Sequence, residues 1–278
     1  MKKIFSIALV ALLSASLYAQ VNMPAPSSTQ TIKQAFGMGS IELTYSRPSI
    51  KGRKVFEQGS ELAPLGKLWR TGANAATKLR FTDFVTIGGK KIDSGTYVLY
   101  TIPNQNEWEI VLNKGVTNWG TDGYKETEDV VRLKVPAMKM SSSVETFTMQ
   151  FADIKNESCE LHLMWGKTAV QIPISTDIKD RLRTQIESAI KGEKPPYQQA
   201  AGFYYEWDKN FPKALENISK AIDANPKGFY LYLTKAKIQR DMGDKEGAKA
   251  SANKTIEVAS QEKNDDYVRQ AKELISKL

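Results

Sequence analysis

The chain has 278 residues, of which 41% are hydrophobic and 25% charged, and its formal net charge is +8. This composition is close to the globular average and excludes a disordered, collagen-like or multi-span membrane protein, while the length predicts two domains. The chain has one cysteine and one histidine. It therefore cannot form an intramolecular disulfide, and we expect neither a metal site nor a cofactor.

Residues 1–19 have the three regions of a secretory signal peptide. Residues 1–3 are a short positive head, residues 4–13 are almost entirely apolar, and residues 14–19 are mostly small. The apolar run is too short to span a bilayer, which needs about 20 residues. We expect cleavage after Ala19, a periplasmic or extracellular location, and no integral membrane segment in the mature chain.

Residues 20–191 are expected to form a β domain. Between residues 41 and 174, apolar and polar residues alternate in short runs separated by turn-forming residues, which predicts an antiparallel β-sandwich or barrel. The predicted strands are 41–45, 79–87, 91–92, 96–102, 108–112, 130–135, 144–151, 160–165 and 168–174. Ile178, Leu182, Ile186 and Ile190 then recur every four residues. This spacing predicts an amphipathic helix at the end of the domain.

Residues 192–196 are expected to be a linker, followed by an all-α module over 197–278. Self-alignment at a separation of 34 residues places Ala214 on Ala248 and Asn210 on Asp244. Small residues at these spacings resemble the tetratricopeptide repeat, in which they let two antiparallel helices approach each other. A final amphipathic helix over 266–278 would cap the stack.

The resemblance to tetratricopeptide repeats implies a concave surface that binds a protein partner. The candidate contact residues are Tyr205, Tyr232 and Gln239. The alternative is a structural buttress, because so few repeats are close to the minimum that buries a continuous core.

Residues 47–80 carry eight Lys and Arg against two Glu. Several guanidinium groups can bind a carboxylate or phosphate in bidentate geometry, so the segment predicts an anion-binding site. The alternative is that these charges lie on a surface loop and only increase solubility. We do not expect a nucleic-acid partner, because the chain carries an export signal and this segment lacks interleaved stacking aromatics.

Within that segment, residues 69–74 read Trp-Arg-Thr-Gly-Ala-Asn. An aromatic ring beside hydrogen-bond donors suits a small anionic or sugar-like ligand. The alternative is a structural knot, in which Arg70 and Asn74 bond backbone carbonyls of the long loop and Trp69 fills the interior of the domain. Trp119 lies in a second loop and could form the opposite wall, or plug a turn. The candidate ligand-binding residues are Arg47, Arg53, Trp69, Arg70, Thr71, Asn74 and Trp119.

Four motifs carry a family resemblance. They are Tyr-Ser-Arg-Pro at 45–48, the run at 64–74 that ends in Trp-Arg-Thr-Gly-Ala-Asn, Gly-Thr-Tyr at 95–97 and Asn-Trp-Gly at 118–120. Over about residues 24–174 the chain resembles the envelope proteins of domain of unknown function 2911, found mainly in the Bacteroidetes. The resemblance implies an exported domain of this extent and no established activity.

These features favour a non-enzymatic envelope protein that binds a ligand or a partner. A hydrolase acting on an envelope glycan or peptide is the first alternative, with Arg47 and Arg70 as anion clamps and a base that the sequence does not identify. A purely structural protein is the second. No catalytic residue is predicted, since Cys159 and His162 are three residues apart on a strand and would face opposite sides of the sheet.

Overall fold

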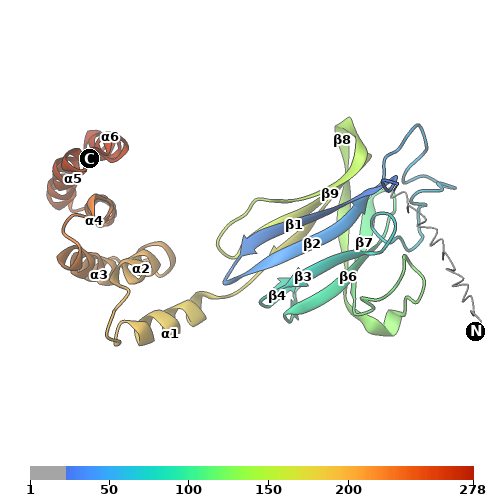
Figure 1. Cartoon of the computed structure of the whole chain (residues 1–278), viewed down its shortest axis with the longest axis horizontal. Coiled ribbons are helices and arrows are strands. Elements are labelled where there is room, and N and C mark those ends of the chain that lie inside the picture. Colours follow the sequence, from blue (N-terminus) through green and yellow to red (C-terminus); the bar gives the residue numbers. More distant parts are fainter. Residues whose placement is uncertain (1–22) are drawn as a thin grey trace, which may run out of the picture.

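The computed structural model describes residues 23–278, so the predicted signal peptide at 1–19 lies outside the described residues. Within 23–278, nine strands come first and six α-helices follow, which confirms the predicted fold class of a β domain and a helical module (Figure 1). The strands are β1 (Ser28–Phe36), β2 (Gly39–Arg47), β3 (Thr77–Phe81), β4 (Val85–Ile87), β5 (Lys90–Ile92), β6 (Gly95–Ile102), β7 (Glu107–Asn113), β8 (Asp129–Ala152) and β9 (Ser158–Ser175). The helices are α1 (Lys179–Ala189), α2 (Tyr197–Gly202), α3 (Phe211–Ala224), α4 (Phe229–Asp241), α5 (Lys245–Gln261) and α6 (Asp265–Ser276). In this range every helix is too short or too polar to cross a membrane.

The strands form one antiparallel sheet in the order β1-β2-β3-β6-β7-β8-β9-β4-β5. The first part of β8 pairs with β7 and the rest pairs with β9, and the β8–β9 register shifts on either side of Val144. Gly166 pairs with Val144 at a φ of +57°, where a Cβ would lie 2.9 Å from Val55. The long β8–β9 ribbon therefore bends here, because glycine adopts this left-handed backbone without steric cost.

This bend folds the sheet over on itself. The Thr176 amide donates to the Glu157 carbonyl at 2.9 Å, so the two ends of β9 meet. On the other side of the domain, the Phe147 amide of β8 donates to the Pro48 carbonyl, just beyond β2, at 2.8 Å. The result is a barrel-like sandwich.

Large aromatic side chains fill the interior of the sandwich. The rings of Trp69 and Trp165 stack at 5.7 Å, and Phe147 packs edge-on against Trp69 at 5.0 Å. All three side chains are buried. This cluster joins the loop after β2 to both long strands and fixes the position of that loop.

Three features of the sheet differ from the sequence prediction. The run predicted as one strand at 79–87 forms two strands, β3 and β4, with residues 82–84 between them. β1 was not predicted, because on this edge strand only Ile32, Ala35 and Phe36 are apolar and most of its residues face solvent. The runs predicted as separate strands at 130–135 and 144–151 are parts of one strand, as are those at 160–165 and 168–174. Local alternation breaks at the bend, where the β8–β9 register shifts, but both strands continue beyond it and pair again.

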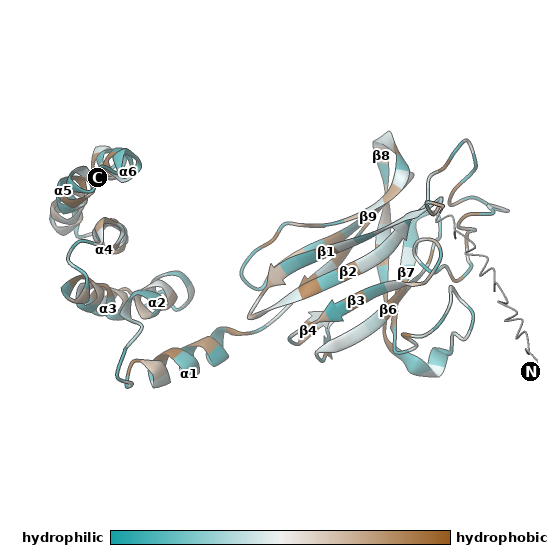
Figure 2. Ribbon diagram, in the orientation of Figure 1, coloured by the Kyte–Doolittle hydropathy of each residue, from teal (hydrophilic) through white to brown (hydrophobic). Residues whose placement is uncertain are grey.

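Helix α1 contacts both the β domain and the helices that follow. Hydrophobic and hydrophilic residues alternate along it (Figure 2). Its apolar residues Leu182 and Ile186, and Ile190 at its C-cap, pack against the helical core, whereas Arg181 donates to the Asp83 carboxylate of the β domain. Residues 192–196, the predicted linker, lie between α1 and α2.

The remaining helices pack in succession, each against the next. Asn210 and Asp244, which the self-alignment matched, are both helix N-caps and accept from the amides of Lys213 and Gly247. Ala214 and Ala248, matched in the same way, are both fully buried. The 34-residue period therefore corresponds to equivalent positions in α3 and α5; the assignment to the tetratricopeptide class stays a prediction.

Candidate functional site

Two long loops meet at the end of the β domain that faces away from the helices. One joins β2 to β3 and contains the Trp-Arg-Thr-Gly-Ala-Asn run, and the other joins β7 to β8 and contains Trp119 (Figure 1). Most of the candidate ligand-binding residues lie on these loops.

Trp69 anchors the first loop in the core. Its backbone exchanges two hydrogen bonds with Thr101 of β6, at 2.8 and 3.0 Å. Its indole Nε1 donates to the Gly72 carbonyl at 3.2 Å. Because only an edge of the ring reaches the surface, Trp69 can offer a ligand a narrow apolar contact and not a whole stacking face.

The turn that follows Trp69 is held by internal hydrogen bonds, as the structural-knot interpretation predicts. Thr71 is fully buried and donates to Thr101 Oγ1 at 3.1 Å, while the Thr77 hydroxyl donates to the Thr71 carbonyl at 2.6 Å. Gly72 has a φ of +151°, and a Cβ there would lie 2.8 Å from the Ser46 carbonyl oxygen. Thr71 therefore maintains the turn and has no hydroxyl proton left for a ligand.

Arg70 points the other way, toward the second loop. Its Nη1 donates to the Asn74 carbonyl at 3.0 Å. The guanidinium packs on Gly120, where a Cβ would lie 2.8 Å from Nη1. Among residues 23–278, no carboxylate lies within ion-pair distance of Arg70. The structure thus holds a half-buried cation in place and leaves most of its donors available.

Arg70 lines a hollow of about 340 Å³, which we call the loop hollow. Glu61, Asn74 and Thr121 supply further polar groups, and the apolar lining includes Leu62 and the edges of Trp69 and Trp165. The volume is within the range of small-ligand sites, which are mostly apolar with a few placed polar groups.

A second hollow of about 300 Å³ lies beside the loop hollow. Its lining includes Tyr45, Asn74, Lys78 and Trp119. Trp119 is 64% exposed, so it does not plug its turn. Asn74 lines both hollows, and its Nδ2 donates to Ser27 O at 3.2 Å and to Ser46 Oγ at 3.3 Å. Trp119 therefore lines the second hollow and not the loop hollow that Arg70 lines.

A model of the family described as protein of unknown function (DUF2911) matches residues 27–174. The chain belongs to the DUF2911 family. The match runs from β1 to the end of β9 and stops before α1, so the helical module lies outside it. A search of curated proteins finds no match.

The two other candidate arginines of the DUF2911 domain line neither hollow. Arg47 donates to the Phe147 carbonyl at 3.1 Å and to Thr148 Oγ1 at 2.9 Å, which ties β2 to β8. Arg53 donates to the Ile50 and Ser49 carbonyls of its own loop. The basic residues of the segment 47–80 therefore do not form one cluster. Of these, only Arg70 and Lys78 line the two hollows.

The candidate partner-binding residues of the helical module also have internal bonds. The Tyr205 hydroxyl donates to Asp241 at 2.6 Å, and burial together with this carboxylate raises the pKa of Tyr205 to about 12. Gln239 is buried between Asp244 and Ser251. Tyr232 donates to the Pro226 carbonyl at 3.1 Å. Tyr205 and Tyr232 are half-buried and keep ring surface at the exterior, whereas Gln239 supports the packing of α4 on α5.

Proposed function

We propose that the protein is an exported cell-envelope binding protein of the DUF2911 family. In this proposal the β domain binds a small ligand with an anionic or sugar-like group in the loop hollow, and the tetratricopeptide-like helices bind a protein partner. Export rests on the signal peptide predicted at 1–19, and the Bacteroidetes envelope is the setting that the family resemblance suggests. The β domain acts by binding and not by catalysis.

The observation that carries the proposal is the half-buried Arg70 without a carboxylate partner among the described residues. A guanidinium has five donor hydrogens, and Asn74 takes one of them. A ligand carboxylate or phosphate could pair with two more in a planar, bidentate arrangement. The hydrogen-bonded turn at Thr71 and Gly72 fixes the backbone beside Arg70 before a ligand binds. This order lowers the entropic cost of binding.

The rest of the lining supports a ligand with both polar and apolar parts. Asn74 and Thr121 can bond hydroxyl groups, and Leu62 with the edge of Trp69 can contact the apolar face of a sugar ring. Glu61 faces the same hollow. Glu61 is therefore the carboxylate to which the hydrolase alternative would assign the role of general base.

A ligand screen on the chain from Gln20 to Leu278 tests this proposal. Thermal unfolding is followed with sugars, uronic acids, phosphates, amino acids and short cell-wall peptides. A ligand at 100 times its dissociation constant should stabilise the protein by about 2.7 kcal/mol. We expect a compound that stabilises wild type but not a folded Arg70→Ala variant.

Arg80→Ala is the matched control, because Arg80 is exposed on β3 and lines neither hollow. It should keep the full response. If no compound stabilises the protein, or if Arg70→Ala responds as wild type does, ligand binding at Arg70 is wrong. Turnover of a stabilising compound that Glu61→Gln abolishes would support the hydrolase instead.

A further inference from the structure

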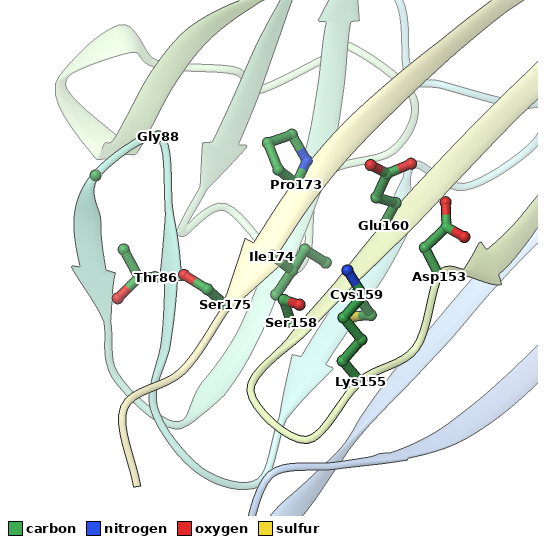
Figure 3. A pocket seen from close by; sticks show the side chains of 11 residues that line it. Thr86, Gly88, Asp153, Lys155, Ser158, Cys159, Glu160, Pro173, Ile174 and Ser175 are labelled. Carbon is green, nitrogen blue, oxygen red and sulfur yellow. The ribbon is translucent and has the colours of Figure 1, made fainter. Parts of the chain in front are cut away.

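A third hollow, of about 370 Å³, lies where the β8–β9 turn meets β4 and the end of β9 (Figure 3). The β8–β9 turn and the end of β9 are at the end of the DUF2911 domain opposite the β2–β3 and β7–β8 loops (Figure 1). Asp153, Lys155, Ser158 and Glu160 line it on one side and Ser175 on another. Neither the family match nor the proposed ligand site involves this end of the domain in any assigned role.

Three potential metal ligands gather at the edge of this hollow. Asp153 directly follows β8, and Ala152 pairs with Glu160 across the ribbon. Glu160 and His162 are two residues apart on β9, so their side chains project from the same face. One ligand atom from each of the three side chains lies within 4.8 Å of the other two. Asp153 and Glu160 lie next to each other in Figure 3.

The group carries two carboxylates, and Lys155 is the one lysine or arginine among the residues that line the adjoining hollow. His162 Nε2 lies 2.7 Å from Glu160 Oε2, and their side chains are 17% and 33% exposed. Among residues 23–278, no lysine or arginine forms an ion pair with Asp153 or Glu160. A cation between the three side chains would offset the repulsion between the carboxylates.

We propose that Asp153, Glu160 and His162 bind a divalent transition-metal ion, with Zn²⁺ bound more tightly than Mn²⁺. An imidazole nitrogen beside two carboxylate oxygens is a donor set that suits these ions, whereas Ca²⁺ and Mg²⁺ prefer oxygen ligands alone. The order between Zn²⁺ and Mn²⁺ follows the general affinity series of divalent metals.

The geometry permits this site with small side-chain movements. Tetrahedral Zn²⁺ with bonds of about 2.0–2.1 Å separates its ligand atoms by roughly 3.3 Å. Asp153 therefore has to move inward by about 1.5 Å at most, and His162 exchanges its contact with Glu160 for the metal. The adjoining hollow has room for the water that completes the coordination.

Cys159 takes no part in this site. It is buried on the opposite face of β9 from Glu160, and burial together with the Glu160 charge raises the pKa of its thiol to about 11. Its side chain therefore projects away from the three proposed ligands. The site is thus built from oxygen and imidazole donors, a combination that a search for clustered His and Cys overlooks.

The single histidine of the chain provides a specific readout. We would treat the untagged chain from Gln20 to Leu278 with a chelator, remove the chelator, and add ZnCl₂ alone while recording the imidazole proton resonances of His162 by NMR. We expect these resonances to shift and to saturate near one equivalent, and MnCl₂ to broaden them. Calorimetry gives the Zn²⁺ affinity.

Variants then assign the ligands. Glu160→Gln, Asp153→Asn and His162→Gln should each weaken Zn²⁺ binding by at least about 10-fold, the lower limit seen when groups that merely support metal ligands are lost. Asp122→Asn, which removes an exposed carboxylate from the β7–β8 loop, should bind as wild type does.

The proposal is overturned if the His162 resonances do not move with Zn²⁺ in the folded chain. It is also overturned if Glu160→Gln and Asp153→Asn bind as tightly as wild type, since the ion then lies elsewhere. CaCl₂ or MgCl₂ binding more tightly than ZnCl₂ would contradict the assigned metal class. None of these outcomes depends on the ligand proposed for the loop hollow.

Discussion

The interior of the β domain is filled by large side chains, whereas the interior of the helical module is filled mostly by small ones. The largest fully buried side chains of the protein are all in the β domain, and they include Trp108, Trp165, Tyr45, Tyr100, Phe81 and Phe147. The fully buried residues of the helical module are mostly alanines: Ala200, Ala201, Ala214, Ala236, Ala248, Ala252, Ala259 and Ala271.

The contrast follows from the spacing of the elements. Packed sheet layers are about 10 Å apart, so large side chains are needed to fill the gap. Helices come within 8–10 Å of each other, and the closest approach requires small residues at the contact. The two regions should therefore be sensitive to opposite substitutions. The β domain should lose stability when a core side chain becomes smaller, and the helical module when one becomes larger.

The largest effect is expected from Trp165→Ala in the β domain. This change removes the ring that stacks on Trp69 at 5.7 Å and leaves a cavity beside Phe147. Aromatic-to-alanine substitutions of this kind cost about 3–5 kcal/mol of the free energy of unfolding. Denaturant unfolding followed by tryptophan fluorescence measures the loss, since four of the five tryptophans are in the β domain.

Trp165→Phe keeps much of the ring volume and is the control for that measurement. It should cost clearly less than Trp165→Ala. A cost for Trp165→Ala below about 1 kcal/mol would mean that the aromatic cluster is loosely packed, and the comparison between the two interiors would fail.

Ala252→Leu should destabilise the helical module by overpacking. Ala252 is fully buried on α5, in one cluster with Ala236 of α4. Inserting a larger side chain into a well-packed core costs about 1–3 kcal/mol. Ala250→Leu, at an exposed position of the same helix, should be nearly neutral. Circular dichroism at 222 nm follows the helices in both variants.

Equal stability of the two leucine variants would show that the helices separate to accept the added volume. In that case a small residue at position 252 would not be needed for the close packing of α4 on α5.

The features that the sequence predicts well are set by neighbouring residues. Strand β6 was predicted at 96–102 and forms at Gly95–Ile102, because a run of β-branched and aromatic residues lies between two turns. Asn210 and Asp244 lie 34 residues apart and cap equivalent helices, because a cap depends only on the next three residues.

The features that it does not predict depend on contacts between distant segments. In the sequence Arg70 and Arg47 are equal candidates, and only the fold separates them, because it packs Arg70 on Gly120 and bonds Arg47 to the Phe147 carbonyl of β8. Asp153 meets His162 through the β8–β9 pairing, which residue types alone do not specify. Periodicity identifies the strands, but their partners decide which side chains are available.

The smallest change in stability is expected from replacing Asp208, which forms ion pairs with helix α1. The variant would show whether the β domain or the helical module stabilises α1. Arg183 and Lys179 of α1 hold the pKa of Asp208, just before α3, below its usual value. The ionised form is thus favoured in the folded protein. The stabilisation is present above the pKa of an unperturbed aspartate, about 3.9, and is lost as the pH falls through the lower folded value.

Asp208→Asn should therefore lower stability at pH 7 by about 1 kcal/mol or less, the range of partly exposed ion pairs, and the difference from wild type should shrink at pH 3. Asp223→Asn, on the exposed face of α3, should leave both the stability and its pH dependence unchanged. Trp207 directly precedes Asp208, so the comparison is made in a Trp207→Phe background, where the fluorescence reports the β domain alone. If the loss then appears in the helical signal at 222 nm and not in the tryptophan fluorescence, α1 is stabilised by the helical module, where its apolar residues pack. A loss confined to the fluorescence would assign α1 to the β domain, through the contact of Arg181 with Asp83.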